Sequence, residues 1–594
     1  MRATDVAGVG PASGNSYTRR EAMRVMAGAP VMAVAMPAND AATPPASADP
    51  AWRELAAAVG ERLIAVRSPL ADCAARAGSG ADALFASLKN PYALGDDPGL
   101  TQTLGWVGAW TSRASTYAVA AESSADVASA VNFARRQRVR LVVRGGGHSY
   151  FGNSNAAGSL LVWTRRMDAI EIHDAFRPLG APADSAPVAA VSIGAGAIWG
   201  RVYDAVAVRA GRYVQGGGCL TVGVAGFVCG GGFGSLSKAF GTGASNLLEA
   251  EVVTADGRVR TVSAHSDPDL FFALRGGGGG TFGVITRLTL RTDPLPATIG
   301  AVLFSLTAAS DTAWRELVAR MLAFYAQALF NPVWGEQLRF SPGRRLSVTM
   351  VFHGLSEPEA AALWQPFLDW IRARPSDYTF AGTPAVIAAP GRRFWDPDLL
   401  RSLPGLVLSD DRAGAPASNV FWASNRGEAA QVLHAYESAW MPAALLSPEQ
   451  RPGLVDALVA ASTRWSVTLH TNKGLAGGAP EAIARTRQTA MNPAVADAFA
   501  LLISAAEGPP AWPGIPGHEP DVARARRDAS AVHAAMGPIR ALVPDSGAYV
   551  SEEDFFRENW PQAYWGVNYA RLAAIKNRYD PAGLFSGHHT VGGT

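Results

Sequence analysis

Cysteine is scarce in this chain of 594 residues, which contains only Cys73, Cys219 and Cys229. Three widely spaced cysteines are too few for a disulfide framework, and their spacing matches no metal site. An excess of charge of one sign is also missing, because 52 basic and 50 acidic residues leave a formal net charge of +2. This balance argues against a nucleic-acid-binding surface. We therefore expect neither a metal centre nor a nucleic-acid partner.

Long hydrophobic runs are lacking too. The apolar run from Val25 to Ala38 is far shorter than the roughly 20 residues that span a bilayer, so we expect no membrane span. It follows the pair Arg19 and Arg20 and precedes small residues, which is typical of a bacterial twin-arginine export signal. The alternative is an ordinary basic N-terminus. The signal interpretation makes residues 1–42 a signal peptide and predicts a secreted or periplasmic protein.

The familiar nucleotide motifs are absent or misplaced. No G-x-x-x-x-G-K-[ST] occurs, which excludes a P-loop ATPase. Gly278, Gly280 and Gly283 satisfy G-x-G-x-x-G, but a predicted helix precedes them and a predicted strand follows. This order is the reverse of the Rossmann fingerprint. The segment therefore predicts a backbone cradle for an anionic group rather than a Rossmann domain.

Glycine, in contrast, is abundant, with 62 residues concentrated between positions 145 and 283. His148 follows three glycines in "VVRGGGHSYFG", and Cys219 follows three more in "GGGCLTVGVAGFVCGGGFG". Glycine lets a backbone approach a ligand closely and offer its N–H groups to an anion. The simpler alternatives are a surface turn with an incidental histidine and a cysteine acting as a small buried hydrophobe, as we expect for Cys73 and Cys229.

Predicted elements place these glycine runs between strands. A helix begins near Trp52, and the chain from Tyr117 onward is typical of strand, helix and strand, with Ser123 or Ser124 as the helix cap. Further predicted strands lie at 160–163, 188–193, 251–254 and 284–290. Beyond residue 296, helices alternate with strands, including a hairpin over 337–352, an alternating strand near 466–474, a loop at 507–520 and a last amphipathic helix that ends at Asp580.

Four motifs together resemble the berberine-bridge-enzyme-like branch of the vanillyl-alcohol-oxidase flavoprotein superfamily. These are "VRGGGHSYFGNSN", the run from Gly216 to Val259, "DPDLFFALRGGGGGTFGVIT" and "YWGVNYARLAAIKNRYDPAGLF". The resemblance implies an α+β fold, with a two-part PCMH-type FAD-binding domain and a substrate domain whose antiparallel sheet is covered by helices. The implied boundaries are 43–109 for a linker and helical segment, 110–295 for the FAD domain, 296–540 for the substrate domain and 541–594 for a returning C-terminal segment.

The resemblance also implies covalently bound FAD. His148 matches the residue that bonds the flavin 8α-methyl, and Cys219 matches the residue that bonds C6. The remaining implied cofactor-binding residues are Arg144, Gly145, Gly146, Gly147 and Ser149 at the pyrophosphate, Thr221, Val222, Gly223, Gly226, Gly230, Gly231 and Gly232 along the flavin, and Gly278, Gly283, Val284 and Asn568 completing the site. Val222 matches a position where valine accompanies oxygen access, which favours an oxidase.

The catalytic base is implied less directly. Family members often use a tyrosine in A-Y-x-N-Y, and here "GAYVSEEDFF" retains Tyr549 but places Ser551 and Glu552 at the last two motif positions. We take Tyr549 as the catalytic candidate, with Glu552, His470 and Lys473 as alternatives. The C-terminal pair His588 and His589 lacks carboxylate or cysteine partners, so we expect a solvated tail there.

The expected function is a secreted FAD-linked oxidase that transfers hydride from an alcohol or amine to flavin and reduces O2 to H2O2. A dehydrogenase with another electron acceptor and a non-catalytic flavin-binding protein remain as alternatives. The substrate is a small molecule, and oligosaccharide hydroxyls, secondary-metabolite alcohols and amines all stay open. The middle of the chain offers four tryptophans that either stack on substrate or belong to the core, namely Trp364, Trp395, Trp422 and Trp465.

Overall fold

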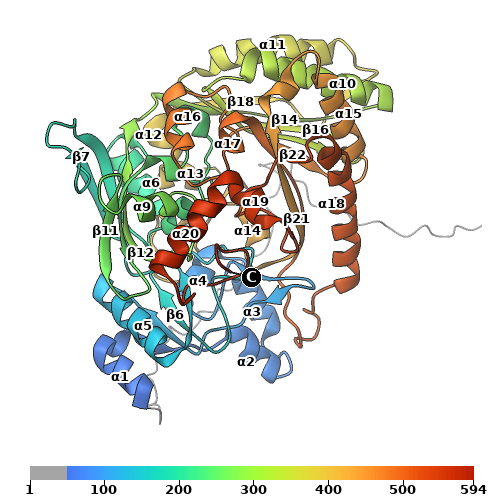
Figure 1. Cartoon of the computed structure of the whole chain (residues 1–594). Coiled ribbons are helices and arrows are strands. Elements are labelled where there is room, and N and C mark those ends of the chain that lie inside the picture. The colour runs from blue at the N-terminus through green and yellow to red at the C-terminus, as the bar shows by residue number, and fades with distance from the viewer. Residues whose placement is uncertain (1–49, 404, 594) are drawn as a thin grey trace, which may run out of the picture.

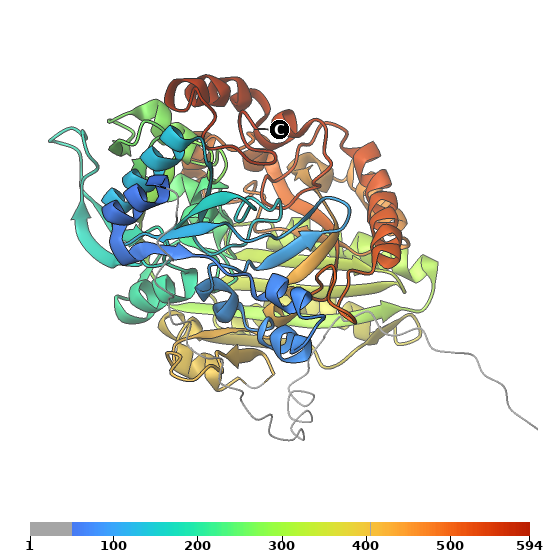
Figure 2. The same ribbon diagram turned by 90° about the horizontal axis from the view of Figure 1, so that it is seen from below.

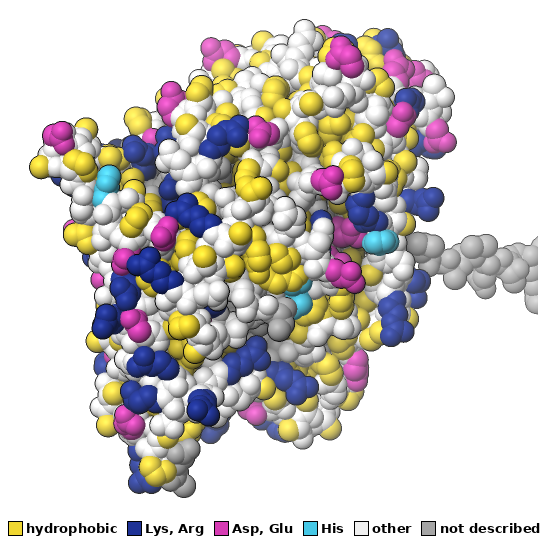
Figure 3. All heavy atoms as spheres, viewed as in Figure 1, with side chains coloured by type: hydrophobic (Ala, Val, Ile, Leu, Met, Phe, Trp, Pro, Cys, Tyr) yellow, Lys and Arg dark blue, Asp and Glu magenta, His cyan; other side chains and the backbone are white. Residues whose placement is uncertain are grey.

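The computed structural model describes residues 50–403 and 405–593. The predicted signal peptide, residues 1–42, lies outside the described residues. The first described element is helix α1 (Pro50–Val59), which includes Trp52 and confirms the helix predicted there. No helix in the described part of the chain is long and apolar enough to cross a membrane. Figure 3 shows acidic and basic side chains interspersed on one face of the molecule.

The first glycine loop leaves a four-stranded sheet with the order β1-β4-β6-β5. Its strands are β1 (Leu63–Ala65), β4 (Tyr117–Ala120), β5 (Arg140–Arg144) and β6 (Ser159–Trp163). Helix α5 (Ser124–Gln137) joins β4 to β5, and Ser123 is its cap, which confirms one of the two predicted caps. Ser123 and Asp126 together form a capping box. Because β4 and β5 both run parallel to β6, the glycines at 145–147 lie where β5 ends at the sheet edge.

The second glycine region surrounds a five-stranded antiparallel sheet with the order β11-β10-β12-β8-β7. Its strands are β7 (Ile170–Phe176), β8 (Val188–Gly194), β10 (Leu247–Val253), β11 (Val259–Ser263) and β12 (Val284–Arg291). Helix α9 (Pro268–Leu274) precedes the glycine run 276–283 and β12 follows it. This order confirms that the G-x-G-x-x-G match belongs to no Rossmann unit. Helix α5 packs between the two sheets, with Val127 in one cluster with Val253 and Val284.

The middle of the chain forms a ten-stranded sheet. Its strands are β17 (Tyr378–Phe380), β14 (Thr298–Ala308), β16 (Arg345–His353), β15 (Trp334–Ser341), β22 (Val467–His470), β23 (Ala498–Gly508), β21 (Gln431–Pro442), β2 (Thr103–Trp106) and β3 (Trp110–Thr111), with β18 (Ala385–Pro390) beside β14. The hairpin predicted over 337–352 is confirmed as β15 and β16, with Leu338 opposite Val348.

Helices cover this large sheet along its top and side in Figure 1. They are α10 (Asp311–Phe324), α11 (Glu357–Arg372), α15 (Arg451–Ser462) and α18 (Val522–Leu542). Trp364 is fully buried beneath them, with its ring 4.9 Å from that of Phe324 and 5.6 Å from that of Phe304. Trp465 is half-buried and donates its indole hydrogen to the Ala505 carbonyl at 2.8 Å. Both tryptophans therefore belong to the protein interior rather than to a sugar-stacking surface.

Two strands of the large sheet, β2 and β3, come from the N-terminal part of the chain. β2 pairs in parallel with β21, with Trp106 opposite Leu433. Residues that precede β4 thus belong to a sheet whose other strands lie between residues 298 and 508. Figure 2 shows the blue N-terminal elements gathered against the yellow-green and orange strands. Because β2 is fully buried, the first described hundred residues tie the two halves together.

The C-terminal segment returns to the glycine run before β12. Helices α19 (Trp560–Trp565) and α20 (Tyr569–Tyr579) lie in the centre of Figure 1. The Trp565 indole donates to the Gly276 carbonyl at 2.9 Å, and Lys576 donates to the Thr281 carbonyl at 2.7 Å. The same lysine forms a buried ion pair with Asp580. Helices α19 and α20 are therefore each fixed to the predicted cradle.

The predicted solvated tail at His588 and His589 is wrong. His589 is only 4% exposed, and its Nδ1 lies 3.0 Å from the Tyr564 hydroxyl. The His588 ring stacks on Phe555 at 3.6 Å, and its Nε2 lies 2.6 Å from the Phe555 carbonyl oxygen. The aromatic side chains that the returning segment brings here cover both imidazoles, which a sequence position near the terminus does not reveal.

Candidate active site

The two glycine loops predicted to converge do so in direct backbone contact. A Cβ on Gly146 would lie 2.6 Å from the Gly223 nitrogen, and a Cβ on Gly223 would lie 2.6 Å from the Gly146 nitrogen. No real Cβ tolerates such a distance, so each position requires glycine because of the other. The loop after β5 and the loop that follows Cys219 therefore form one unit.

His148 and Cys219 meet on either side of a single hydroxyl. The Thr221 Oγ1 lies 3.4 Å from His148 Nε2 and 3.5 Å from Cys219 Sγ. All three residues line one small cavity together with Tyr150 and Glu428. The structure thus brings the two nucleophiles of the sequence prediction together and adds Thr221 as the group between them.

The surroundings fix the protonation of both nucleophiles. Burial lowers the pKa of His148 to about 4, so its imidazole is neutral at neutral pH. Nε2 faces the Thr221 hydroxyl, and a hydrogen bond to the Thr221 backbone opposes the effect of burial on the pKa. Burial and the negative charge of Glu428 raise the pKa of the Cys219 thiol to about 11, although hydrogen bonds at Thr221 oppose this shift. The thiol therefore carries its proton.

The two later glycine runs expose bare backbone. Gly226, Gly279 and Gly280 are exposed, and a Cβ on Gly226 or Gly280 would meet nothing within 4 Å. The Gly278 nitrogen donates to the Cys229 carbonyl at 2.9 Å, which holds the two glycine runs side by side. Backbone free of side chains suits a large planar cofactor with an anionic diphosphate. The residues present therefore fit FAD.

Other predicted glycines support the loops by close packing. A Cβ on Gly231 would lie 2.6 Å from the Met491 methyl carbon, and one on Gly232 would lie 2.4 Å from the Phe227 ring. A Cβ on Gly230 would lie 2.6 Å from the Ser551 hydroxyl oxygen. Gly283 has φ +155° and lies against β10, while Val284 is fully buried as the first residue of β12. These packing contacts support the backbone of the predicted cradle.

Three polar residues of the prediction act through neighbouring segments. Arg144 is 3% exposed and donates to the backbone carbonyls of Leu100 and Asp97, so its guanidinium anchors the N-terminal segment instead of facing a diphosphate. The Ser149 hydroxyl accepts the Asn153 N–H at 3.3 Å. Asn568 donates to the Met491 carbonyl at 2.8 Å and so fixes the segment that packs on Gly231.

Tyr549 is buried at the end of the glycine run. Its hydroxyl accepts the Gly232 N–H at 3.3 Å, and its ring packs against Phe233 and Trp440. Burial raises its pKa to about 12, so the phenol keeps its proton at neutral pH. Lys473 and Glu552, two alternatives named from the sequence, form an ion pair beside it, with Lys473 Nζ 5.9 Å from the centre of the Tyr549 ring.

The third alternative, His470, lies at the end of β22 in the same half of the molecule. Burial, together with the positive charges of Lys473 and Arg339, lowers its pKa well below the usual value. Its imidazole is therefore neutral. Two further tyrosines, Tyr150 and Tyr436, pack with ring centres 5.2 Å apart, and Tyr150 lines the cavity of His148 and Cys219.

A segment that follows α13 (Pro397–Arg401), residues 406–428, reaches across to this cavity. It contains β19 (Val407–Ser409), β20 (Val420–Trp422) and α14 (Asn425–Glu428). The Trp422 indole donates to the Gly218 carbonyl at 2.8 Å, directly beside Cys219. Tyr92 donates its hydroxyl hydrogen to the Val420 carbonyl at 2.9 Å. Helix α14 thereby places Asn425 and Glu428 in the lining of the cavity.

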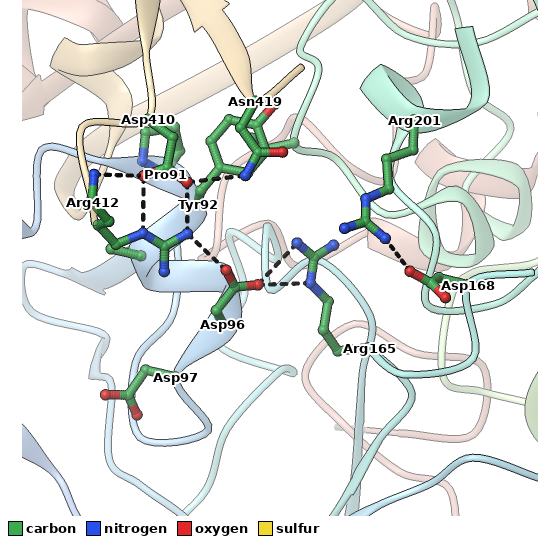
Figure 4. Close-up of polar contacts among 12 residues, drawn as sticks. Pro91, Tyr92, Asp96, Asp97, Arg165, Asp168, Arg201, Asp410, Arg412 and Asn419 are labelled. Atoms are coloured by element: carbon green, nitrogen blue, oxygen red, sulfur yellow. Dashed lines mark hydrogen bonds and ion pairs between the residues drawn. The ribbon is translucent and has the colours of Figure 1, made fainter. Parts of the chain in front are cut away.

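Charged side chains hold this 406–428 segment, as Figure 4 shows. Arg412 bonds Asp410 at 2.7 Å and Asp96 at 2.8 Å, and Asp96 also pairs with Arg165 of the FAD-binding half. Burial opposes ionisation of Asp410, but hydrogen bonds from Arg412, Asn419 and Asn90 outweigh it and lower its pKa to about 2. Asp410 is therefore a fixed anion that joins three parts of the chain.

Glu428 was not predicted as a site residue from the sequence. An isolated glutamate in a loop without a motif gives no signal, and only the contacts of the 406–428 segment bring it to Cys219. Desolvation raises its pKa to about 7, while the Asn425 amide, which donates to its carboxylate at 2.9 Å, works in the opposite direction. Its side chain lines the cavity and is also exposed to solvent.

Two family models match this chain. An FAD binding domain matches residues 115–263, and a "Berberine and berberine like" segment matches residues 548–592. The chain is 32% identical over 487 residues to the FAD-linked oxidoreductase easE of Trichophyton verrucosum, covering 80% of this chain and 73% of that protein. It is 30% identical over 478 residues to the FAD-linked oxidoreductase ZEB1 of Gibberella zeae, covering 79% and 75%.

Solved structures share the fold. The VAO-type flavoprotein MtVAO615 of Myceliophthora thermophila superposes with a TM-score of 0.72 at 24% identity, covering 92% of this chain and 96% of that one. The glucooligosaccharide oxidase of Acremonium strictum, which carries a 6-S-cysteinyl, 8α-N1-histidyl FAD, superposes with a TM-score of 0.59 at 21% identity, covering 80% and 91%.

The fold is that of the vanillyl-alcohol-oxidase type of flavoprotein, with the α+β architecture of an FAD domain and a helix-covered sheet. The chain belongs to the berberine-bridge-enzyme-like FAD-linked oxidoreductases. FAD is thus its cofactor, and the glycine cradle is where the residues suit it.

Proposed function

We propose that this protein is an oxidase with doubly linked FAD, which removes hydride from an alcohol or amine and passes the electrons to O2. The observation that carries the proposal is the convergence of His148 and Cys219 on Thr221 in one cavity. A histidine and a cysteine from separate glycine loops have no structural need to meet there. Bonds from both to one flavin account for their position.

Residues of the chain orient the groups that bond FAD and position the substrate. FAD, when bound, accepts the hydride. Thr221 contacts Nε2 of a neutral His148 and so orients the ring for its bond to the cofactor. The glycine backbones leave space for the ring and diphosphate. The Tyr549 hydroxyl contacts the Gly232 N–H and Ser551 and keeps its own proton, and it is the group that we propose to hold a substrate oxygen or nitrogen.

Two kinds of relative support this function. The glucooligosaccharide oxidase with the same fold carries a histidyl and cysteinyl flavin. The fungal relatives are FAD-linked oxidoreductases. The proposed substrate is accordingly a small molecule with an oxidisable hydroxyl, either a sugar or a secondary metabolite, or an amine. Val222 beside the two nucleophiles leads us to propose O2 as the acceptor and H2O2 as the product.

The test is the mass of the denatured protein. We expect the wild type to carry one FAD, and we expect His148→Ala and Cys219→Ala each to retain it through the other bond. Only the double variant should release all flavin on denaturation. A wild-type chain without bound FAD mass would overturn the double link. Comparing reoxidation of the reduced enzyme by O2 with reduction of a dye decides between oxidase and dehydrogenase.

The twin-arginine signal supports a further proposal, export after folding. A protein that receives its cofactor before export needs a route that carries folded chains. We expect Arg19→Lys with Arg20→Lys to retain the flavoprotein in the cytoplasm of a bacterial host, measured by flavin fluorescence in cell fractions. Unchanged export of the double variant would contradict the assignment.

A further inference from the structure

We propose that Glu428 is the proton acceptor for Cys219 when the thiol bonds the flavin ring. This inference rests on the proposed double linkage. It assigns a role to a carboxylate that no motif marks and that the hydride transfer does not use.

The cavity provides the geometry. Glu428, Cys219 and His148 line the same small space, and among the residues that line it Glu428 is the only carboxylate. The bond from Trp422 to the Gly218 carbonyl fixes the 406–428 segment next to Cys219, six residues before Glu428. The Asn425 amide donates a hydrogen bond of 2.9 Å to the Glu428 carboxylate. A base must reach its proton directly or through one water, and Glu428 lines the cavity of Cys219 and acts on the thiol through its charge.

The alternative bases nearby are already engaged. His148 faces Thr221 through Nε2, and its ring is the group that bonds the flavin in the proposed double linkage. Lys473 is paired with Glu552. Other titratable groups also act on this site, because Glu507 and Glu552 raise the pKa of Glu428 and Lys473 lowers it, while Tyr150 and Tyr436 are held neutral by burial. A carboxylate that holds a proton near neutral pH can accept one and release it again.

Formation of the bond between Cys219 and flavin C6 is a two-electron oxidation. The S–H bond of Cys219 breaks, its proton passes to Glu428, and the sulfur electron pair forms the S–C6 bond. The C6–H bond breaks and that hydrogen leaves as a proton, so two electrons and two protons remain with the ring and its surroundings. Dioxygen, the co-reactant, accepts both electrons and both protons to give H2O2, and the ring returns to its oxidised form.

The experiment isolates each bond by removing the other. In a His148→Ala background only the cysteine link forms, and in a Cys219→Ala background only the histidine link forms. We expect Glu428→Gln to lower the fraction of denatured His148→Ala chains that carry FAD by about tenfold or more. The same substitution should leave the fraction in Cys219→Ala unchanged. Glu519→Gln, which removes an exposed carboxylate of a loop outside the cavity lining, is the matched control.

A second readout separates proton transfer from misfolding. Expression or incubation with FAD at pH 9 to 10 should restore part of the cysteine link in His148→Ala/Glu428→Gln, because more thiolate then forms without a base. Equal losses in both backgrounds, or no loss in either, would overturn the role of Glu428. If His148→Ala with Glu428 intact already lacks the link, the double attachment itself is wrong, and the inference falls with it.

Discussion

At the scale of single residues, Thr221 is the group on which the flavin site depends most closely. Its hydroxyl is the one polar atom that both His148 Nε2 and Cys219 Sγ approach, at 3.4 and 3.5 Å. The side chain orients the imidazole, and it sets the distance between the two nucleophiles. A neighbouring hydrogen-bonding group of this kind orients a reactive histidine by contacting its other ring nitrogen.

Thr221→Val keeps the shape of the side chain and removes the hydroxyl. We expect it to reduce the doubly linked fraction of the protein severalfold, because the His148 ring loses its fixed orientation. Thr221→Ser should restore the linkage, since the hydroxyl returns. Mass spectrometry of the intact denatured protein measures both. Full linkage in Thr221→Val would contradict the orienting role.

Tyr549→Phe tests the catalytic assignment. The variant keeps the ring packing on Phe233 and Trp440 and removes only the hydroxyl that faces Gly232. We expect flavin loading to stay unchanged and the rate of flavin reduction by substrate to fall by about 10²-fold. Stopped-flow absorbance measures the rate, and Tyr378→Phe, far away in the helix-covered core, is the control. A fall of less than about twofold would remove Tyr549 from the reaction.

His589 predicts a loss of stability in acid. Burial lowers its pKa in the folded protein to about 3, and the ordinary value in an unfolded chain is 6.5. Below pH 6.5 the unfolded chain therefore binds a proton that the folded protein refuses. The free energy of unfolding should fall by up to about 1.4 kcal/mol per pH unit between pH 6 and 4 from this residue.

Thermal unfolding from pH 7 to pH 4.5 measures this effect. We expect His589→Asn to show a shallower decline than the wild type, whereas His265→Asn at an exposed position should follow the wild type. Parallel curves for all three proteins would show that His589 does not carry the acid sensitivity.

At the scale of elements, most of the secondary structure could be predicted and one segment could not. The capping box at Ser123 and the hairpin of β15 and β16 are local features, so the sequence contains them. The 406–428 segment has two three-residue strands and a four-residue helix, held by Asp410, Trp422 and Tyr92. Contacts across hundreds of residues fix it, and no local pattern records them.

Asp410→Ala tests how firmly this segment is held. The substitution removes the acceptor for Arg412, Asn90 and Asn419 in a fully buried position. We expect the free energy of unfolding to fall by about 2–3 kcal/mol, measured by chemical denaturation. Asp398→Ala, whose side chain pairs with Arg401 at the surface, should change it by less than about 0.5 kcal/mol. Equal effects would mean that Asp410 acts only as a surface charge.

At the scale of the whole molecule, the sequence identified the cofactor site better than the reaction site. His148 and Cys219 stand in glycine runs that favour close backbone approach, and the two loops do meet at Gly146 and Gly223. The contacts of Arg144 were harder to predict, because a charged residue beside such a loop suggests a phosphate ligand. In the structure its partners are carbonyls of the N-terminal segment. Glu428 was out of reach because its position depends on the complete fold.

The placement of β2 beside β21 has a consequence for synthesis. A strand finished after about a hundred residues must wait for more than three hundred others before its partner emerges from the ribosome. Until then its hydrogen-bonding edge is open to chaperones or to mispairing, and helix α19 still has to dock on Gly276. The large sheet is therefore completed only after β21 has been synthesised, which makes its assembly a late event.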